Sequence, residues 1–89
     1  MTMRKRVLVG GRVQGVFFRD TCRRIATKAG VSGSAANLPD GRVEVVLEGE
    51  EDAVDAVIEW CRQGTDYSDV GSVEVKEEAP RGVEGFSIL

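Results

Sequence analysis

The fold is decided by the run Arg42-Val43-Glu44-Val45-Val46-Leu47-Glu48. Its odd-numbered positions are apolar and most of its even-numbered positions are charged, so an extended strand would have one buried face and one wet face. Pro39-Asp40-Gly41 predicts a turn just before it, and residues 33–38 predict a second, weaker strand before that turn. Residues 33–48 are therefore expected to form a hairpin with one buried face.

Apolar residues at three- and four-residue steps predict a helix on each side of this hairpin. The first covers about Asp20 to Ala29 and stops at Gly30, and the second follows the acidic residues 50–52 and ends near Gly64. Further strands are expected at residues 4–9, around Val73 and Val75, and at Phe86 with Ile88. This order predicts an α+β, ferredoxin-like βαββαβ sandwich, with two helices on one face of a four- to five-stranded antiparallel sheet.

Length and composition predict one folded domain over residues 1–89. The chain is 42% hydrophobic and 30% charged, which is ordinary for a globular domain. The net charge is −3, yet residues 1–28 hold eight of the 12 basic side chains and one of the 15 acidic ones. The first third is thus a candidate anion site, and a solvated basic face is the alternative interpretation.

Several classes of protein are excluded at this stage. The chain has no histidine and only two cysteines, Cys22 and Cys61, so the usual metal ligand sets, Ser-His or Cys-His pairs and histidine general bases are not expected. No apolar run approaches the ~20 residues of a membrane helix, and the N-terminus does not resemble a signal peptide. We expect a cytoplasmic protein that needs no metal or cofactor, and the acidic pI of about 4.9 argues against nucleic acid.

A glycine-spaced loop joins the first strand to the first helix, in the run Gly11-Arg12-Val13-Gln14-Gly15-Val16-Phe17-Phe18-Arg19. Backbone N–H groups at such a junction can surround an anion, and the helix dipole adds positive potential. Gly15 lets an anion approach the main chain, and Arg19 offers a planar fork of donors for two phosphate oxygens. A turn glycine beside a surface arginine is the competing interpretation, because the spacing is neither that of a P-loop nor that of a dinucleotide fingerprint.

The same run closely resembles the first signature of the acylphosphatase family, with its Gly-x-Val-Gln-Gly-Val-x-Phe-Arg pattern intact. The second signature is also represented, by Gly33, Asn37, Gly41, Val43 and Gly49 at matching spacing. The resemblance extends over nearly the whole chain. It implies a hydrolase that converts acyl phosphates to a carboxylate and inorganic phosphate.

The resemblance also implies the roles of individual residues. Arg19 would bind the phosphate together with the backbone amides of Gly15, Val16, Phe17 and Phe18, and Asn37 would orient the attacking water. Without the resemblance, Asn37 would be taken as a polar residue leading into the turn. The implied partners are a small-molecule acyl phosphate as substrate and inorganic phosphate as product and inhibitor, and we expect a monomer. No side-chain base is evident, so a phosphate oxygen of the substrate is the expected proton acceptor.

Three positions depart from the family pattern. Ser34 stands where an aromatic residue is usual, Ala36 where a basic one is common, and Gly64-Thr65-Asp66 replaces a proline-containing segment. A missing aromatic would remove about 1.5 to 3 kcal/mol of burial if that side chain is normally covered, which predicts lower stability or a looser loop.

Four further residues receive structural interpretations. Cys22 and Cys61 are expected to be neighbours in the core as reduced thiols, Trp60 to pack at the flank of the core, and Asp20 to cap the first helix while facing away from the phosphate. The main rival function is a non-catalytic ferredoxin-like module that binds an anion or a partner. An RNA-binding domain would need exposed aromatics on its central strands, and residues 42–48 contain none.

Overall fold

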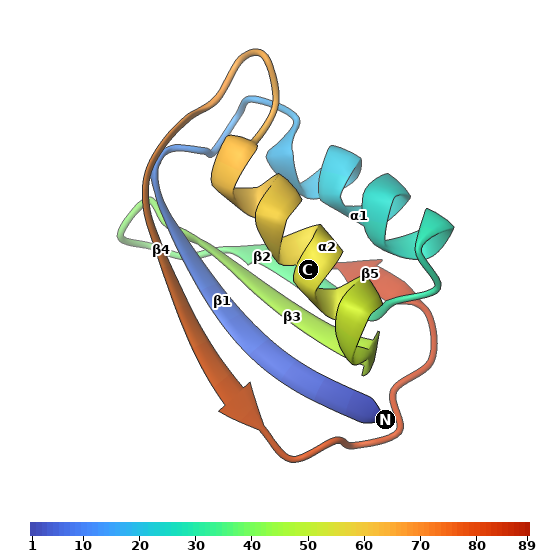
Figure 1. Ribbon diagram of the computed structural model, residues 1–89. Helices are drawn as coiled ribbons and strands as arrows, with labels where there is room; N and C mark the ends of the chain where they lie inside the picture. Colours follow the sequence, from blue (N-terminus) through green and yellow to red (C-terminus); the bar gives the residue numbers. More distant parts are fainter.

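The computed structural model describes all residues 1–89 and contains the expected elements in the expected order (Figure 1). They are β1 (Thr2–Arg12), α1 (Phe18–Lys28), β2 (Ser32–Asn37), β3 (Val43–Glu50), α2 (Glu51–Gln63), β4 (Asp69–Glu78) and β5 (Phe86–Ile88). Neither helix has the length and apolar character that crossing a membrane requires.

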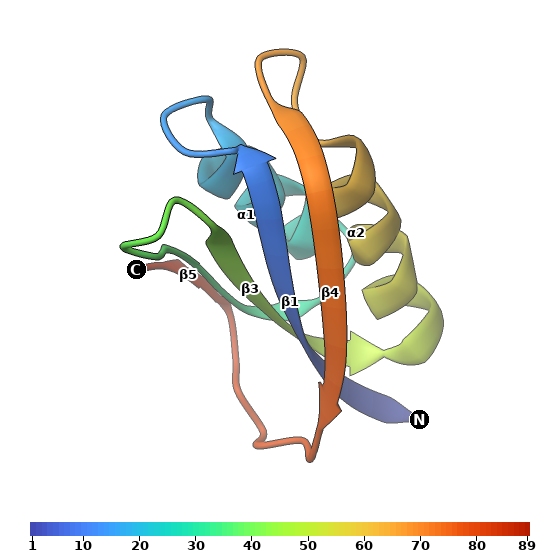
Figure 2. The same cartoon turned by 90° about the vertical axis from the view of Figure 1, so that its left-hand side faces the viewer.

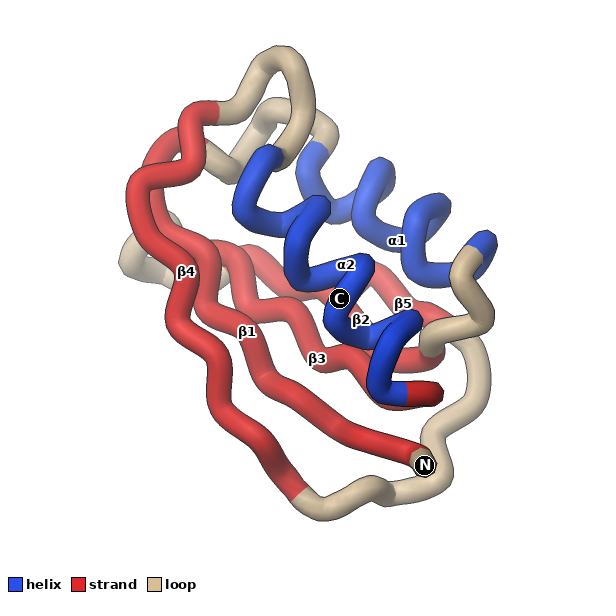
Figure 3. The backbone as a smooth tube through the Cα atoms, in the orientation of Figure 1, coloured by secondary structure: helices blue, strands red, loops and turns tan.

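The five strands form one sheet in the order β4-β1-β3-β2-β5, and both helices cover the same face of it (Figure 3). The first four strands pair antiparallel, which confirms the ferredoxin-like prediction. The fifth strand differs from the expectation of a wholly antiparallel sheet, because β5 pairs parallel with β2 and makes the sheet mixed. Residues 79–85 turn the chain back after β4, so that β5 runs beside β2 in the same direction (Figure 2).

The core lies between the helices and the sheet. Val43, Val45 and Leu47 of β3 are fully buried, as their alternation predicts. Val7 and Val9 of β1 join them, and one contiguous cluster of 15 buried residues connects these strands to both helices.

The cysteine and tryptophan predictions are confirmed. Cys22 and Cys61 are free and fully buried in the same core cluster, and interaction with Cys61 together with burial raises the pKa of the Cys22 thiol. Trp60 is partly buried against the core, and its ring centroid lies 4.9 Å from that of Phe18.

The start of α1 differs from the prediction. The helix begins at Phe18 rather than Asp20, and no side chain caps it, so the interpretation of Asp20 as a capping residue is wrong. Its carboxylate instead accepts a hydrogen bond from Arg23 at 2.9 Å and lies 3.7 Å from a guanidinium nitrogen of Arg24. These basic side chains lie one turn further along the same helix, where they can reach the carboxylate.

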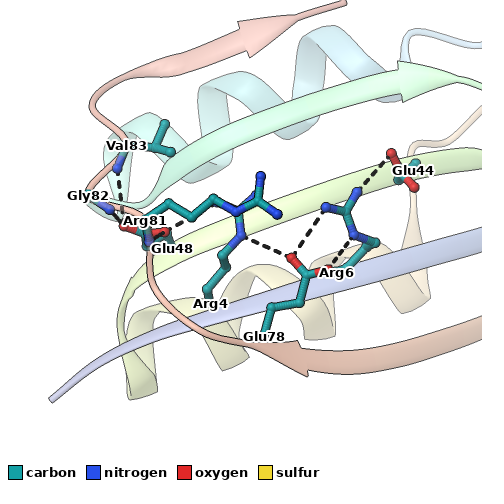
Figure 4. A network of polar contacts seen from close by, with 8 residues as sticks. All are labelled: Arg4, Arg6, Glu44, Glu48, Glu78, Arg81, Gly82 and Val83. Atoms are coloured by element: carbon teal, nitrogen blue, oxygen red, sulfur yellow. Dashed lines mark hydrogen bonds and ion pairs between the residues drawn. The ribbon is translucent and has the colours of Figure 1, made fainter.

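The first three basic residues of β1, residues 4–6, are paired with acidic side chains. Arg4 pairs with Glu48 and Glu78, and Arg6 pairs with Glu78 and with Glu44 (Figure 4). Lys5 pairs with Asp55 of α2. The charge asymmetry along the sequence is thus partly offset in space by acidic residues of neighbouring elements.

The unusual residues of β2 lie on the face of the sheet away from the helices. Ser34 is opposite Val46 and Ala36 is opposite Glu44, whereas Ala35 between them is fully buried in the core. An aromatic side chain at position 34 would therefore cover the outer face, and its absence leaves the main core intact.

Candidate active site

The loop between β1 and α1 has an unusual backbone conformation. Gly15 has φ 73°, and Phe17 has φ 62° and ψ 21°, which makes it the only residue other than glycine with a positive φ. The left-handed conformation costs a non-glycine residue about 1 to 2 kcal/mol. Strained backbone of this kind is concentrated at functional sites, where the surrounding structure holds it in place.

This conformation leaves four successive backbone donors without partners. The N–H groups of Gly15, Val16, Phe17 and Phe18 donate to no acceptor within the protein. Donors at the N-terminus of a helix that lack internal partners form a binding site for an anion, and the helix dipole favours negative charge there. The backbone therefore offers what a phosphate group needs.

A cavity of about 270 Å³ adjoins this loop. It brings Arg19 and Asn37 together with the loop residues Gly15, Phe17 and Phe18, although Asn37 is 18 positions further along the chain. Of the site residues predicted from sequence, only Val16 does not line the cavity. The other residues that line the cavity are Val13, Asp20 and Ile88.

Arg19 is placed in the first turn of α1. Its Nη1 donates a hydrogen bond to the main-chain oxygen of Leu89 at 2.9 Å, and the Leu89 N–H donates to the oxygen of Ala35 at 2.9 Å. No acidic side chain pairs with Arg19, and the nearby carboxylate of Asp20 is paired with Arg23. The guanidinium thus keeps both its charge and several free donors.

Asn37 is the last residue of β2, beside the turn that leads to β3. The Leu38 N–H donates to the oxygen of Arg42 at 2.8 Å and the Gly41 N–H to the oxygen of Leu38 at 3.1 Å, which fixes the turn. The carboxamide of Asn37 makes no hydrogen bond within the protein and is exposed at the cavity. It can both donate to and accept from a water molecule.

Two residues that position the loop had no role in the sequence analysis. Gln14 Nε2 donates to the oxygen atoms of Leu38 and Arg42, at 2.8 and 3.0 Å, and so ties the loop to the turn after Asn37. On the other side, Thr65 Oγ1 donates to the oxygen of Val16 at 2.9 Å. Gln14 is part of the first signature and could have been suspected, whereas Thr65 stood out only as part of the segment 64–66 that departs from the family pattern.

The segment around Thr65 forms a turn closed by its own side chains. Thr65 N–H donates to Ser68 Oγ at 2.7 Å, and that hydroxyl donates back to the Thr65 oxygen at 2.9 Å. The segment 64–66, which departs from the family pattern, thus forms a turn that supports the loop between β1 and α1. No group of three or more Cys, Asp or Glu side chains in the structure could hold a metal ion.

Comparison with known proteins identifies the class. The acylphosphatase family model matches residues 5–88. An acylphosphatase of Rubrobacter xylanophilus is 56% identical over 98% of this chain and 80% of its own length, and one of Haloarcula marismortui is 48% identical over 96% and 93%. The crystal structure of an acylphosphatase from Bacillus subtilis superposes with a TM-score of 0.95 at 38% identity, covering 100% of this chain and 99% of the other.

These matches define a small α+β hydrolase. The chain belongs to the acylphosphatase family. Its substrates are accordingly acyl phosphates, and its products include inorganic phosphate.

Proposed function

We propose that this chain hydrolyses acyl phosphates by holding the phosphate group with Arg19 and the amides of residues 15–18 while Asn37 holds the attacking water. The observation that carries this proposal is the set of free donors around one cavity. The free backbone N–H groups of residues 15–18 belong to the loop beside this cavity, and Arg19, which pairs with no acidic side chain, and the unbonded carboxamide of Asn37 both line it. In this proposal residues 13–17, between β1 and α1, form a phosphate loop. The donors suit a phosphate, and the carboxamide suits a water molecule.

The reaction needs little covalent chemistry from the protein. The water oxygen forms a bond to phosphorus, and the bond from phosphorus to the acyl oxygen breaks and leaves its electron pair on the carboxylate. A proton of the water passes to a phosphate oxygen of the substrate. Arg19 and the amides stabilise the negative charge on the phosphoryl oxygens as the bonds exchange, which is the principal way in which phosphoryl transfer is accelerated.

The test is hydrolysis of benzoyl phosphate by the purified chain and its Asn37→Ala variant. Loss of the carboxamide should lower kcat about 100- to 1000-fold, the range observed when an oxyanion donor is removed, while KM changes little. Inorganic phosphate should still inhibit the variant competitively. Gln63→Ala removes another exposed carboxamide, at the end of α2 and outside the cavity, and should behave as wild type.

Two outcomes would contradict these assignments. Loss of phosphate binding in Asn37→Ala would make Asn37 a phosphate ligand rather than a water guide. Phosphate binding without any hydrolysis by the wild type would favour the alternative of a non-catalytic anion-binding module.

We also propose that residues 1–89 act as a single-domain monomer in the cytoplasm, on a small-molecule substrate and without nucleic acid or a cofactor. A cavity built entirely from one chain and a pI of about 4.9 support this view. Light scattering after size-exclusion chromatography should give the mass of one chain, 9.6 kDa. Cell fractionation tests the location, and a dimeric mass or a membrane-bound fraction would contradict the proposal.

A further inference from the structure

A second cavity lies next to the phosphate cavity and shares one residue with it. This groove has a volume of about 380 Å³ and is lined by three aromatic residues, Phe17, Trp60 and Tyr67, together with the chain from Gly64 to Asp66. Phe17 lines both cavities, with its backbone in the phosphate loop. A molecule bound by its phosphate in the first cavity can therefore extend past Phe17 into the groove.

The two aromatic rings at the edge of the groove are exposed to an unusual degree. The Phe17 residue is 69% exposed and Tyr67 is 64% exposed. Their rings meet edge to face, with centroids 5.9 Å apart and planes at 63°. Burial in the core does not explain two large exposed rings, and an exposed apolar surface of this kind is a common feature of ligand-binding sites.

The in-line geometry of phosphoryl transfer places the leaving group on the side of this groove. In phosphoryl transfer the attacking and leaving oxygens lie roughly in line on opposite sides of phosphorus. Gln14 joins the phosphate loop to the turn beside Asn37, whereas Thr65 and Arg12 join it to the α2–β4 connection that lines the groove. The loop thus lies between the β2–β3 turn, which follows Asn37, and the α2–β4 connection, which lines the groove; Figure 2 shows the loop between these two segments. A water held by Asn37 would displace the acyl group away from β2, across Phe17.

We propose that the groove between Phe17, Trp60 and Tyr67 receives the acyl part of the substrate and selects aromatic acyl phosphates over small aliphatic ones. This inference rests on the proposed function. An aromatic acyl group can pack against the exposed rings in the edge-to-face or offset geometry that aromatic pairs prefer, whereas an acetyl group is too small to reach them. Arg24 and Asp66, one residue of each charge, also line the groove, so a neutral acyl group fits it better than a charged one.

The test compares kcat/KM for benzoyl phosphate and acetyl phosphate in the wild type, Tyr67→Ala and Tyr67→Phe. Removing the ring should lower kcat/KM for benzoyl phosphate by about 3- to 10-fold, which corresponds to one aromatic contact. The value for acetyl phosphate should change less than about twofold. Tyr67→Phe retains the ring and should keep the wild-type ratio between the two substrates.

Inhibition by inorganic phosphate provides the control for folding, and its inhibition constant should be the same in all three proteins. An equal loss on both substrates in Tyr67→Ala, or no loss on either, would overturn the acyl subsite while leaving the hydrolytic function in place. A folded wild type that binds phosphate but hydrolyses neither substrate would instead overturn the proposed function, and the acyl subsite with it.

Discussion

At the scale of single residues, the site depends on an arginine whose position is fixed while its charge stays available. One guanidinium nitrogen of Arg19 donates a hydrogen bond to the main-chain oxygen of Leu89, and no acidic side chain pairs with the remaining donors. The carboxylate of the neighbouring Asp20 accepts a hydrogen bond from Arg23. A guanidinium offers two parallel donors to a phosphate, and a lysine ammonium in the same place would act as a point charge on a flexible stem.

We therefore expect Arg19→Lys to impair both ground-state and transition-state binding. KM for benzoyl phosphate should rise and kcat should fall, so that kcat/KM drops at least about 100-fold, the scale of a lost transition-state donor. Steady-state kinetics measure both constants, and circular dichroism serves as the control for folding. A variant with normal KM would show that Arg19 does not hold the phosphate in the ground state.

At the scale of elements, the phosphate loop is held on two sides by segments that are distant in sequence. Gln14 of the loop donates hydrogen bonds to the β2–β3 turn, which follows Asn37. On the other side, Thr65 of the α2–β4 connection donates a hydrogen bond to the loop. In the proposed mechanism, these two hydrogen-bonded contacts set the distance between the loop amides that hold the phosphate and the Asn37 carboxamide that holds the water. Positioning errors as small as 1 Å can cost about 100-fold in rate, so these contacts matter for catalysis as well as for stability.

Thr65→Val tests the second contact with little change in shape. The variant loses the hydrogen bond that Thr65 Oγ1 donates to the Val16 oxygen and the one that it accepts from the Tyr67 N–H at 3.3 Å, so its free energy of unfolding should fall by about 1 to 2 kcal/mol. Its kcat/KM for benzoyl phosphate should fall more than this small loss of stability explains, because the loop amides are no longer held in place. Chemical denaturation and kinetics measure the two effects, and full activity in a destabilised variant would contradict the positioning role. Thr65→Ser, which keeps the hydroxyl, is the matched control.

The sequence predicted the two helices, the first four strands and the buried face of β3, because these depend on local periodicity. It missed the start of α1, since the left-handed conformation of Phe17 is imposed by the surroundings of the loop and violates local preference. The parallel pairing of β5 was also missed, because three residues carry too little pattern to fix a direction.

The candidate site was predicted mainly through the family signatures. Periodicity alone could place Arg19 at the end of the loop, but it could not bring Asn37 to the same cavity. The position of Asn37 at the cavity depends on the register in which it pairs with Val43 at the end of β2. Thr65 was missed because its hydrogen bond to Val16 spans 49 positions of sequence.

At the scale of the whole molecule, a network of charges on the outer face of the sheet fixes the path of the chain to β5 (Figure 4). Glu48 of β3 accepts hydrogen bonds from the N–H groups of Arg81, Gly82 and Val83, and it also pairs with Arg4 at 3.2 Å. Arg81, Gly82 and Val83 belong to the segment that leads to β5. Since β5 leads to Leu89, whose oxygen contacts Arg19, this network supports the active site from the opposite end of the sheet.

The same network predicts how stability depends on pH. Hydrogen bonds from Arg6 and Arg4 lower the pKa of Glu78 to about 2, and the backbone N–H groups of residues 81–83, together with Arg4, lower the pKa of Glu48. A lowered pKa in the folded state means that the contribution to stability is complete above the ordinary value near 4.5 and is lost as the pH falls toward 2.

We expect the free energy of unfolding to decline between about pH 4.5 and 2 and to depend little on these two groups from pH 5 to 8. Glu78→Gln should be less stable than the wild type at pH 7, and the difference should shrink across the acid range. Urea denaturation at a series of pH values measures this. If the difference in the free energy of unfolding between the two proteins were the same at all pH values, the pKa of Glu78 would not differ between the folded and unfolded states, which would contradict this prediction.

In the proposed mechanism, water attacks phosphorus in the cavity lined by Arg19 and Asn37. The most direct measurement is hydrolysis of benzoyl phosphate in water enriched in oxygen-18, followed by mass spectrometry of both products and corrected for the reaction without enzyme. Attack at phosphorus predicts that the label enters inorganic phosphate and that the benzoate remains unlabelled. Label in the carboxylate of benzoate would mean attack at the carbonyl carbon, and would contradict the mechanism in which Arg19 and the loop amides hold the reacting centre.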